Sequence, residues 1–220
     1  MDYVILPNSE LRAHARQQLQ GVWGQMALVF FILFLISLPY NIASILNSMG
    51  TLTLDIPSFF AITMLLGIIT IVISGPLYLG LVGYLLKRVR AQEIAIENIF
   101  DGFKRFFPSF LLLFFSGLFV FLWSLLFIIP GIIKIFSYSM AFFIMYDNPD
   151  IKPLAALKKS QIMMKGYKWK LFLLVLSFIG WILLGLLTLC IGYFWLYPYI
   201  WLSQANFYEN LRIGQEKGFI

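Results

Sequence analysis

The sequence predicts an all-α fold, a polytopic transmembrane helical bundle of about six spans that form three hairpins, with cytoplasmic amphipathic helices. Three observations lead to this prediction. The chain of 220 residues is 61% hydrophobic and only 12% charged, whereas a soluble domain carries about 25% charged residues. Apolar runs of the length that crosses a bilayer recur along the chain. The basic residues gather in alternate segments between these runs.

The apolar runs define six expected helices, since a spanning helix needs about 20 mostly apolar residues. The expected spans are Val22–Leu46, Phe59–Leu86, Ser109–Ile129, Ile132–Tyr146, Leu171–Cys190 and Tyr193–Tyr208. Pro130-Gly131 is expected to separate the third span from the fourth, and Gly192 to mark the turn before the sixth. Short turns produce antiparallel neighbours, so these pairs are expected to be hairpins.

The distribution of charge predicts how the chain is oriented. Fifteen of the 16 Lys and Arg residues lie in the N-terminal segment, the two long loops and the C-terminal segment, and the sixteenth, Lys134, lies just inside the fourth span. Cytoplasmic loops of membrane proteins carry an excess of Lys and Arg. Both termini and both long loops are therefore predicted to be cytoplasmic, which agrees with an even number of spans.

One integral membrane domain over residues 1–220 is expected. The first apolar run follows a charged segment and has no small-residue cleavage pattern after it, so it is interpreted as a span and not as a signal peptide. The expected parts are a cytoplasmic N-terminal helix at 1–21, a first hairpin at 22–86, a cytoplasmic amphipathic loop at 87–108, a second hairpin at 109–146, a basic cytoplasmic loop at 147–170, a third hairpin at 171–208 and a cytoplasmic tail at 209–220.

The three hairpins also resemble repeats of one unit. A segment of helical character precedes each hairpin and ends near a glycine and an aromatic residue, at Gly21, Gly102 and Gly166. The second and third hairpins end alike, as Tyr146-Asp147-Asn148 and Tyr208-Glu209-Asn210. We therefore expect three similarly oriented units, with chance similarity between apolar sequences as the alternative.

The two long loops show helical periodicity. In the first loop the apolar face comprises Ile96, Ile99, Phe100, Phe103 and Phe107. In the second, lysines lie opposite Ala156 and Met163. Such helices can lie in the membrane interface with basic side chains at lipid phosphates. The candidate contacts for anionic lipid are Lys158, Lys165, Lys168, Lys104 and Arg105. The alternative is that both segments only cap the bundle and enforce its topology.

Polar residues inside the spans are the candidates for a functional site, because charge is costly in lipid. Ser137 and Tyr138 follow Lys134 at i+3 and i+4, near one helix face. The candidate polar intramembrane site comprises Lys134, Ser137, Tyr138, Gln204 and Asn206. Two roles are open for Lys134: a buried pairing or ligand contact, for instance with Asp55, and snorkelling to the outer interface. Helix packing is the alternative for the uncharged members.

No catalytic, metal or cofactor site is predicted. A single histidine, His14, and a single cysteine, Cys190, exclude an internal disulfide and His-rich or Cys-based metal sites. Phosphate-binding glycine loops and the common zinc-protease and serine-hydrolase motifs are missing. Catalysis would need a polar constellation, for example Asp147, Lys158 and Asn206 within hydrogen-bond distance. The net charge of +6 is explained by topology, so no nucleic-acid partner is expected.

Several motifs in the second half of the chain occur together in one known family. They include Ile129-Pro130-Gly131-Ile132-Ile133-Lys134, Ser137-Tyr138-Ser139-Met140, Asp147-Asn148-Pro149-Asp150, Ala156-Leu157-Lys158-Lys159-Ser160 and Met163-Met164-Lys165-Gly166. This pattern resembles DUF975, a family of uncharacterised bacterial integral membrane proteins, most closely from Ile129 to Tyr208. The resemblance implies six spans and no particular activity. The family's recurring residues correspond to Pro130, Gly131, Lys134, Asp147, Asn148, Pro149, Lys158, Ser160 and Gly166. Phe136 and Phe142-Phe143 depart from it, where smaller residues or proline are expected.

Three functions are considered. The first is a non-enzymatic scaffold or accessory envelope component of a bacterial cell membrane, without cofactor, whose basic cytoplasmic face binds anionic headgroups, a protein partner or a second copy of the chain. The second is a small-molecule transporter, channel or export helper with its polar site around Lys134 and a second span broken at Gly75-Pro76. The third is a membrane-embedded enzyme that acts on lipid.

Overall fold

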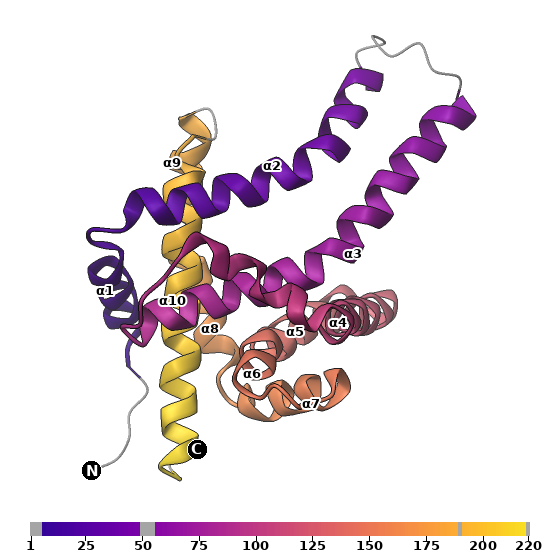
Figure 1. Ribbon diagram of the computed structural model, residues 1–220. Coiled ribbons are helices and arrows are strands. Elements are labelled where there is room, and N and C mark those ends of the chain that lie inside the picture. The colour runs from indigo at the N-terminus through magenta and orange to yellow at the C-terminus, as the bar shows by residue number, and fades with distance from the viewer. Residues whose placement is uncertain (1–5, 49–55, 189–190, 219–220) are drawn as a thin grey trace.

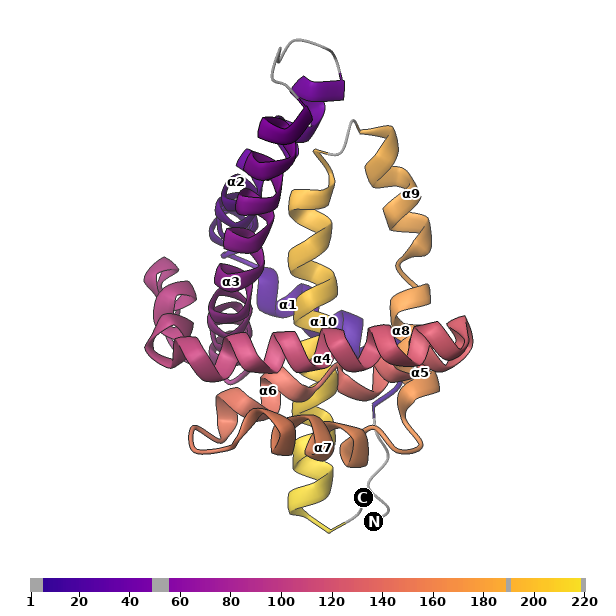
Figure 2. The same ribbon diagram turned by 90° about the vertical axis from the view of Figure 1, so that its right-hand side faces the viewer.

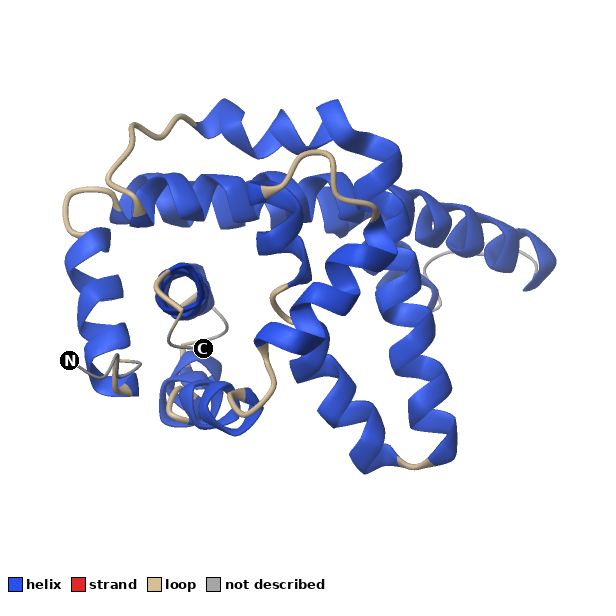
Figure 3. Ribbon diagram, turned by 90° about the horizontal axis from the view of Figure 1, so that it is seen from below, coloured by secondary structure: helices blue, strands red, loops and turns tan. Residues whose placement is uncertain are grey.

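The structure is a computed structural model that describes residues 6–48, 56–188 and 191–218. Every regular element in these ranges is a helix, as Figure 3 shows, so the predicted all-α class is confirmed for them. The elements are α1 (Asn8–Leu19), α2 (Trp23–Ser48), α3 (Ile56–Val89), the 3₁₀ helix η1 (Ile96–Arg105), α4 (Phe106–Leu126), α5 (Ile128–Tyr138), α6 (Ala141–Asp147), α7 (Pro153–Met163), α8 (Lys168–Leu176), α9 (Ile179–Leu187) and α10 (Tyr193–Glu216).

About four helical stretches within the described residues are long and apolar enough to cross a membrane. They are Pro57–Val89, Ile96–Leu126, Ile128–Asp147 and Lys168–Leu187, which correspond to the second to fifth expected spans. The first expected span qualifies only together with α1, which meets the start of α2 at a bend of 97°. The sixth lies in α10, which is not among these stretches.

The helices form three pairs that diverge from a common base. In Figures 1 and 2, α2 with α3 and α9 with α10 project in one direction, and α4 with α5 runs across them. We call the base, which consists of α1, η1, α6, α7 and the C-terminal half of α10, the basal layer. Fully buried side chains such as Leu19, Tyr84, Ile99 and Phe207 lie in this layer or next to it. The expected bundle is therefore packed mainly around its base.

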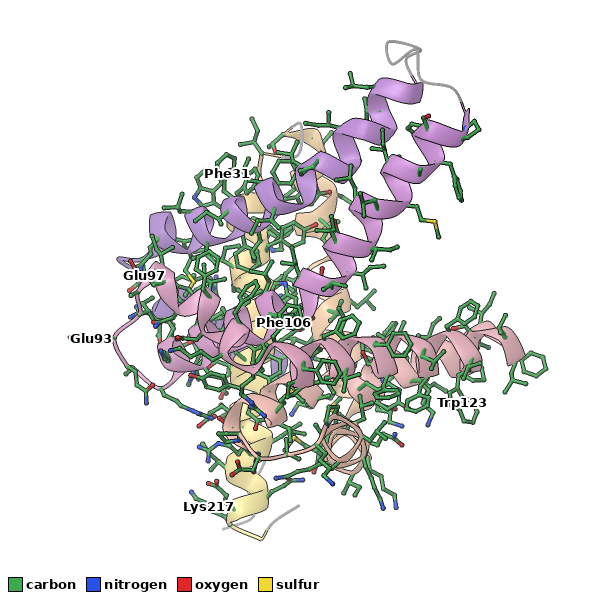
Figure 4. The ribbon with its side chains drawn as sticks, turned by 45° about the vertical axis from the view of Figure 1, so that its right-hand side comes forward. Phe31, Glu93, Glu97, Phe106, Trp123 and Lys217 are labelled. Carbon is green, nitrogen blue, oxygen red and sulfur yellow. The ribbon has the colours of Figure 1, made fainter. Side chains whose placement is uncertain are left out.

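The distal halves of the helix pairs expose apolar side chains. Leu65, Phe121 and Leu187 are 58%, 59% and 79% exposed. Figure 4 shows nitrogen and oxygen atoms gathered around α7 and the lower part of α10, whereas the side chains on the far parts of α2, α3 and α4 are almost entirely carbon. Contiguous apolar surface of this kind is rare on soluble monomers and marks contact with lipid or a partner. The structure is thus compatible with a membrane protein.

The closest packing joins α3 to η1 and requires glycine on both elements. A Cβ atom on Gly80 would lie 1.7 Å from the carbonyl oxygen of Ile99, and one on Gly102 would lie 1.9 Å from that of Pro76. The two backbones therefore touch directly. The expected break at Gly75-Pro76 is wrong, because α3 continues through it. A proline inside a helix removes one hydrogen bond and bends the helix, and η1 packs against this turn.

Two other expected breaks have different outcomes. The turn between α4 and α5 falls at Phe127 and not at Pro130-Gly131. Pro130 instead occupies the first turn of α5, where its missing N–H costs no helical hydrogen bond. The expected turn at Gly192 is confirmed, since α10 begins at Tyr193.

Helix boundaries also differ in the fourth and fifth spans and in the tail. The fourth span is divided between α5 and α6, and the fifth between α8 and α9. The tail expected at 209–220 continues α10 to Glu216. Arg212 forms ion pairs with Glu209 and Glu216, three residues before it and four after it, and such pairs stabilise a helix.

Of the apolar face expected in the first long loop, Ile99 is buried, but Phe100, Phe103 and Phe107 are exposed. The second long loop follows the expectation more closely, because Ala156 and Met163 are buried and Lys158 is exposed. A 3₁₀ helix has three residues per turn instead of 3.6. The buried residues of η1, Ile99 and Gly102, are therefore three positions apart, and the phenylalanines form an exposed apolar surface.

Gly80→Ala is expected to destabilise the protein, by about 1–3 kcal/mol as for overpacked cores, because the new methyl group would collide with the backbone of η1. The measurement is thermal unfolding of the purified protein in detergent. Gly117→Ala is the matched control, since a Cβ there meets nothing within 4 Å. A melting temperature for Gly80→Ala equal to that of the Gly117→Ala variant would contradict the α3–η1 contact.

Candidate functional site

Five polar side chains from three parts of the chain meet in the basal layer. Arg90 directly follows α3, Asp147 ends α6, and Tyr208, Glu209 and Arg212 lie on α10. We call this cluster the Arg90 junction. Its three parts follow or end the three helix pairs, so the junction connects all of them.

The Arg90 guanidinium binds both carboxylates of the junction. Its Nη1 and Nη2 atoms donate hydrogen bonds to the two oxygens of Asp147 at 2.8 and 2.7 Å. Its Nε and Nη2 atoms donate to Oε2 of Glu209 at 3.2 and 2.9 Å. The Tyr208 hydroxyl donates to Asp147 at 2.8 Å, and Arg212 donates to both oxygens of Glu209. The planar fork of a guanidinium suits such bidentate pairing, which lysine cannot reproduce.

The junction is largely shielded from water, and each of its carboxylates is paired with an arginine. The side chains of Asp147 and Glu209 are each 14% exposed, and that of Arg90 is 25% exposed. Hydrogen bonding to Asp147 raises the pKa of Arg90; burial opposes this effect and Glu209 reinforces it. Burial also pushes the pKa of Glu209 upward, but the hydrogen bonds from Arg212 and Arg90 hold it below its ordinary value of 4.5. Glu209 therefore stabilises the fold above that pH and loses this contribution as the pH falls through its folded pKa.

A cavity of about 610 Å³ opens beside the junction. Its lining is mainly polar and combines junction residues with Asn148, Lys159, Met163, Gln215 and Glu216. The volume is in the range of small-molecule sites, but the carboxylates of the junction are already held by arginines. Within the described ranges, no three His, Cys, Asp or Glu side chains come close enough to hold a metal ion.

The structure does not bring the five candidates for an intramembrane site together. Lys134 lies on α5 with its Nζ atom 4.7 Å from the ring centre of Trp123 and 5.8 Å from that of Tyr138. Trp123 is labelled in Figure 4 toward the tip of α4. These are cation–π contacts. Tyr138 lies one helical turn after Lys134, so its ring reaches the ammonium group. Asp55, the other expected partner of Lys134, lies outside the described residues.

Ser137 takes part in a buried contact between α5, α6 and α7. The Ser160 hydroxyl donates to the Ser137 carbonyl oxygen at 2.8 Å and accepts the Met140 N–H at 3.2 Å. Both backbone groups lie at the break between α5 and α6, where a buried polar group needs a partner. Ser160 therefore attaches α7 to the second helix pair.

Asn206 joins two helices, in line with the packing alternative for the uncharged candidates, and its partner Gln18 lies on α1. The amides of Asn206 and Gln18 exchange two hydrogen bonds of 3.1 and 2.7 Å. Gln204 is half-buried on the same helix. Asp147, Lys158 and Asn206 are not connected to one another by hydrogen bonds, so the constellation that an enzyme would need is not assembled from them.

The five candidate lipid contacts fall into two groups. Lys158 and Lys165 are exposed and Lys168 is half-buried, and none of the three has an ion-pair partner among the described residues. Lys104, by contrast, pairs with Asp101 at 2.7 Å. Arg105 donates to the carbonyl oxygens of Met145 and Pro149, where it caps α6.

Sequence reasoning did not identify four of the five junction residues as members of a site: Arg90, Tyr208, Glu209 and Arg212. The similar hairpin ends around Asp147 and Glu209 already showed two acidic residues at equivalent positions. That similarity predicts that both carboxylates lie near the base, but nothing in it identifies Arg90 as the shared cation.

The fold and the junction define an all-helical protein with about four apolar helices, compatible with a membrane, above a polar base. The chain belongs to the family described as Protein of unknown function (DUF975), whose sequence pattern matches residues 1–138 and 127–215. The resemblance stated from the sequence is therefore confirmed. No curated protein and no solved structure matches the chain.

Arg90→Gln is expected to destabilise the fold by about 3 kcal/mol, the lower end for removing one partner of a buried ion pair, because Asp147 would lose its cation and Glu209 would keep only Arg212. The difference in unfolding free energy between the variant and the unsubstituted protein should become smaller below pH 4.5, where protonation of Glu209 removes its contribution. Chemical or thermal unfolding in detergent at a series of pH values measures both effects.

Lys87→Gln provides the control. Lys87 forms a longer ion pair of 3.5 Å with Asp101. Asp101 is 32% exposed, against 14% for Asp147, and it keeps Lys104 as a second partner, so the loss of Lys87 should cost at most about 1 kcal/mol. Equal effects of the two substitutions would show that the junction has no special structural role.

Proposed function

We propose that the protein is a six-span integral membrane protein that acts as a non-enzymatic scaffold in the cell membrane, with its basal layer in the cytoplasm in contact with anionic headgroups. The observation that carries this proposal is the separation between exposed apolar helix halves and an exposed basic surface on α7. A multi-pass protein needs both surfaces, one for the hydrocarbon core and one for the cytoplasmic face.

Six spans require that all three helix pairs leave the base on one side and return to it. The pair α2 with α3 and the pair α9 with α10 project in one direction, whereas α4 with α5 runs across them and must turn to cross the same bilayer. The Leu6 N–H donates to the Asn210 side chain at 3.1 Å, so the N-terminal stretch and the end of α10 lie at the same end of the molecule. The first half of α10 carries half-exposed aromatic residues, including Trp195 and Tyr197, which suit a membrane interface. Both termini then lie in the cytoplasm with the basic loops.

The basic surface consists of Lys158, Lys159 and Lys165 at α7 and just after it. All three are exposed, and none has an acidic partner in the described part of the chain. The opposite side of α7 packs inward through Ala156, Leu157, Ser160 and Met163. A helix anchored in this way presents its lysines outward, where each can gain about 1 kcal/mol at an anionic membrane surface.

The alternative of a transporter receives less support. It needs Lys134 in a polar cavity, whereas the Lys134 ammonium lies against the Trp123 ring and the junction cavity does not include it. A lysine beside a tryptophan near the tip of a helix pair fits snorkelling to the outer interface. An enzyme is also less supported, because the junction carboxylates are occupied by arginines.

The topology predicts opposite accessibility for two engineered cysteines. In a Cys190→Ser background, Lys134→Cys should react with a membrane-impermeant thiol reagent only from outside, and Lys158→Cys only from the cytoplasmic side. The measurement uses intact cells and inverted membrane vesicles. If both positions react from the same side, the proposed course of the second helix pair is excluded.

The basic surface predicts a preference for anionic lipid. Native mass spectrometry of the detergent-purified protein, titrated with equal amounts of phosphatidylglycerol and phosphatidylcholine, should show more bound phosphatidylglycerol. The triple substitution Lys158→Gln, Lys159→Gln, Lys165→Gln should reduce that excess. Lys104→Gln should not, because Asp101 already neutralises Lys104. Equal binding of both lipids by the unsubstituted protein would refute headgroup recognition.

A further inference from the structure

We infer that the space between α1, α9 and α10 is a binding site for one anionic phospholipid. Its phosphate would lie against Arg12 and Arg16, and an acyl chain would lie along α9 and α10. The inference rests on the proposed membrane location and adds a single, saturable site to the diffuse basic surface of α7.

The site is a cavity of about 640 Å³ with chemically different ends. Arg12 and Arg16 of α1 line one end, beside Tyr199 of α10. From Tyr199 the lining follows α10 to Gly192 at the turn after α9, a distance of roughly 10 Å at 1.5 Å per helical residue. The cationic end of the cavity suits a lipid headgroup. The apolar stretch along α9 and α10 suits the first part of an acyl chain.

The two arginines lack anionic partners. They are four residues apart and so lie on one side of α1, while Leu11, Ala15 and Leu19 are buried against the fold. Neither forms an ion pair within the described ranges, and the Nε atom of Arg12 is buried without a hydrogen-bond acceptor. An unsatisfied buried donor is costly. Phosphate oxygens are the acceptors that the guanidinium fork fits best.

The apolar part of the lining distinguishes a lipid from a soluble anion. Trp23, Trp181 and Trp195 line it together with Leu184 and Leu196, and Trp181 and Trp195 are 56% and 51% exposed. Tryptophan is enriched at the level of lipid headgroups. A free phosphate would leave this surface in contact with water, whereas a phospholipid covers it. The apolar cavity between α2, α3 and α10 carries no charged side chain and so has no comparable anchor.

The experiment measures quenching of tryptophan fluorescence by phosphatidylglycerol with brominated acyl chains, added to the purified full-length protein in neutral detergent. The unsubstituted protein should show saturable quenching, with a weaker effect of brominated phosphatidylcholine. The midpoint is the lipid concentration that gives half-maximal quenching. Arg12→Gln with Arg16→Gln should raise it by about five-fold for each arginine removed. Lys104→Gln with Lys217→Gln removes the same number of positive side chains at exposed positions outside both the cavity and the basic surface of α7, and should leave the midpoint unchanged.

Two tryptophan substitutions locate the quenched rings and keep the test decisive if the arginine variant does not fold. Trp181→Phe should remove a large part of the saturable quenching, and Trp123→Phe, on α4, should not. Equal effects of these two substitutions would overturn the site.

Three further results would also overturn it. One is an unchanged midpoint in a folded arginine variant, another is equal weakening by both charge variants, and the third is displacement of the lipid by excess inorganic phosphate. If the unsubstituted protein does not distinguish the two lipids, the proposed headgroup recognition fails as well. A lipid preference that survives the arginine substitutions refutes only this site.

Discussion

The three helix pairs are held together by one shared cation. Arg90 binds Asp147 and Glu209 at the same time, and these residues belong to segments that are far apart in the chain. The geometry has little tolerance, because one guanidinium must satisfy two carboxylates that would otherwise repel each other. Uncharged hydrogen bonds then complete the base, such as the amide pair of Gln18 and Asn206 and the Ser160 bridge.

The polar base explains how the distal halves of the helices can remain so apolar. Figures 1 and 2 show that the pairs separate with distance from the basal layer, so little protein surface is available there to cover their side chains. In lipid this arrangement carries no penalty, since the hydrocarbon is as apolar as leucine. Hydrogen bonds and ion pairs in the base, together with the glycine contact between Gly80 and η1, therefore provide the specific packing.

The basal layer also separates two kinds of basic residue. Arg90, Arg105 and Arg212 have partners within the protein, whereas Arg12 and Arg16 and the lysines of α7 face outward or into a cavity. Charge counts along the chain treat them alike. This division agrees with two roles for basic residues: some arginines hold the base together, and other basic side chains are available to anions at the surface.

The sequence by itself determined the all-α class, the family, the approximate helices and the alternation of basic and apolar segments, because hydropathy and helical periodicity are local properties. It did not determine where helices break: Pro76 lies inside α3, and the α4–α5 turn falls at Phe127. Only the tertiary structure identified Arg90 as the partner of Asp147 and Glu209, and showed Lys134 against Trp123. These contacts join residues far apart in the chain, and no local pattern specifies which of several cations reaches a given carboxylate.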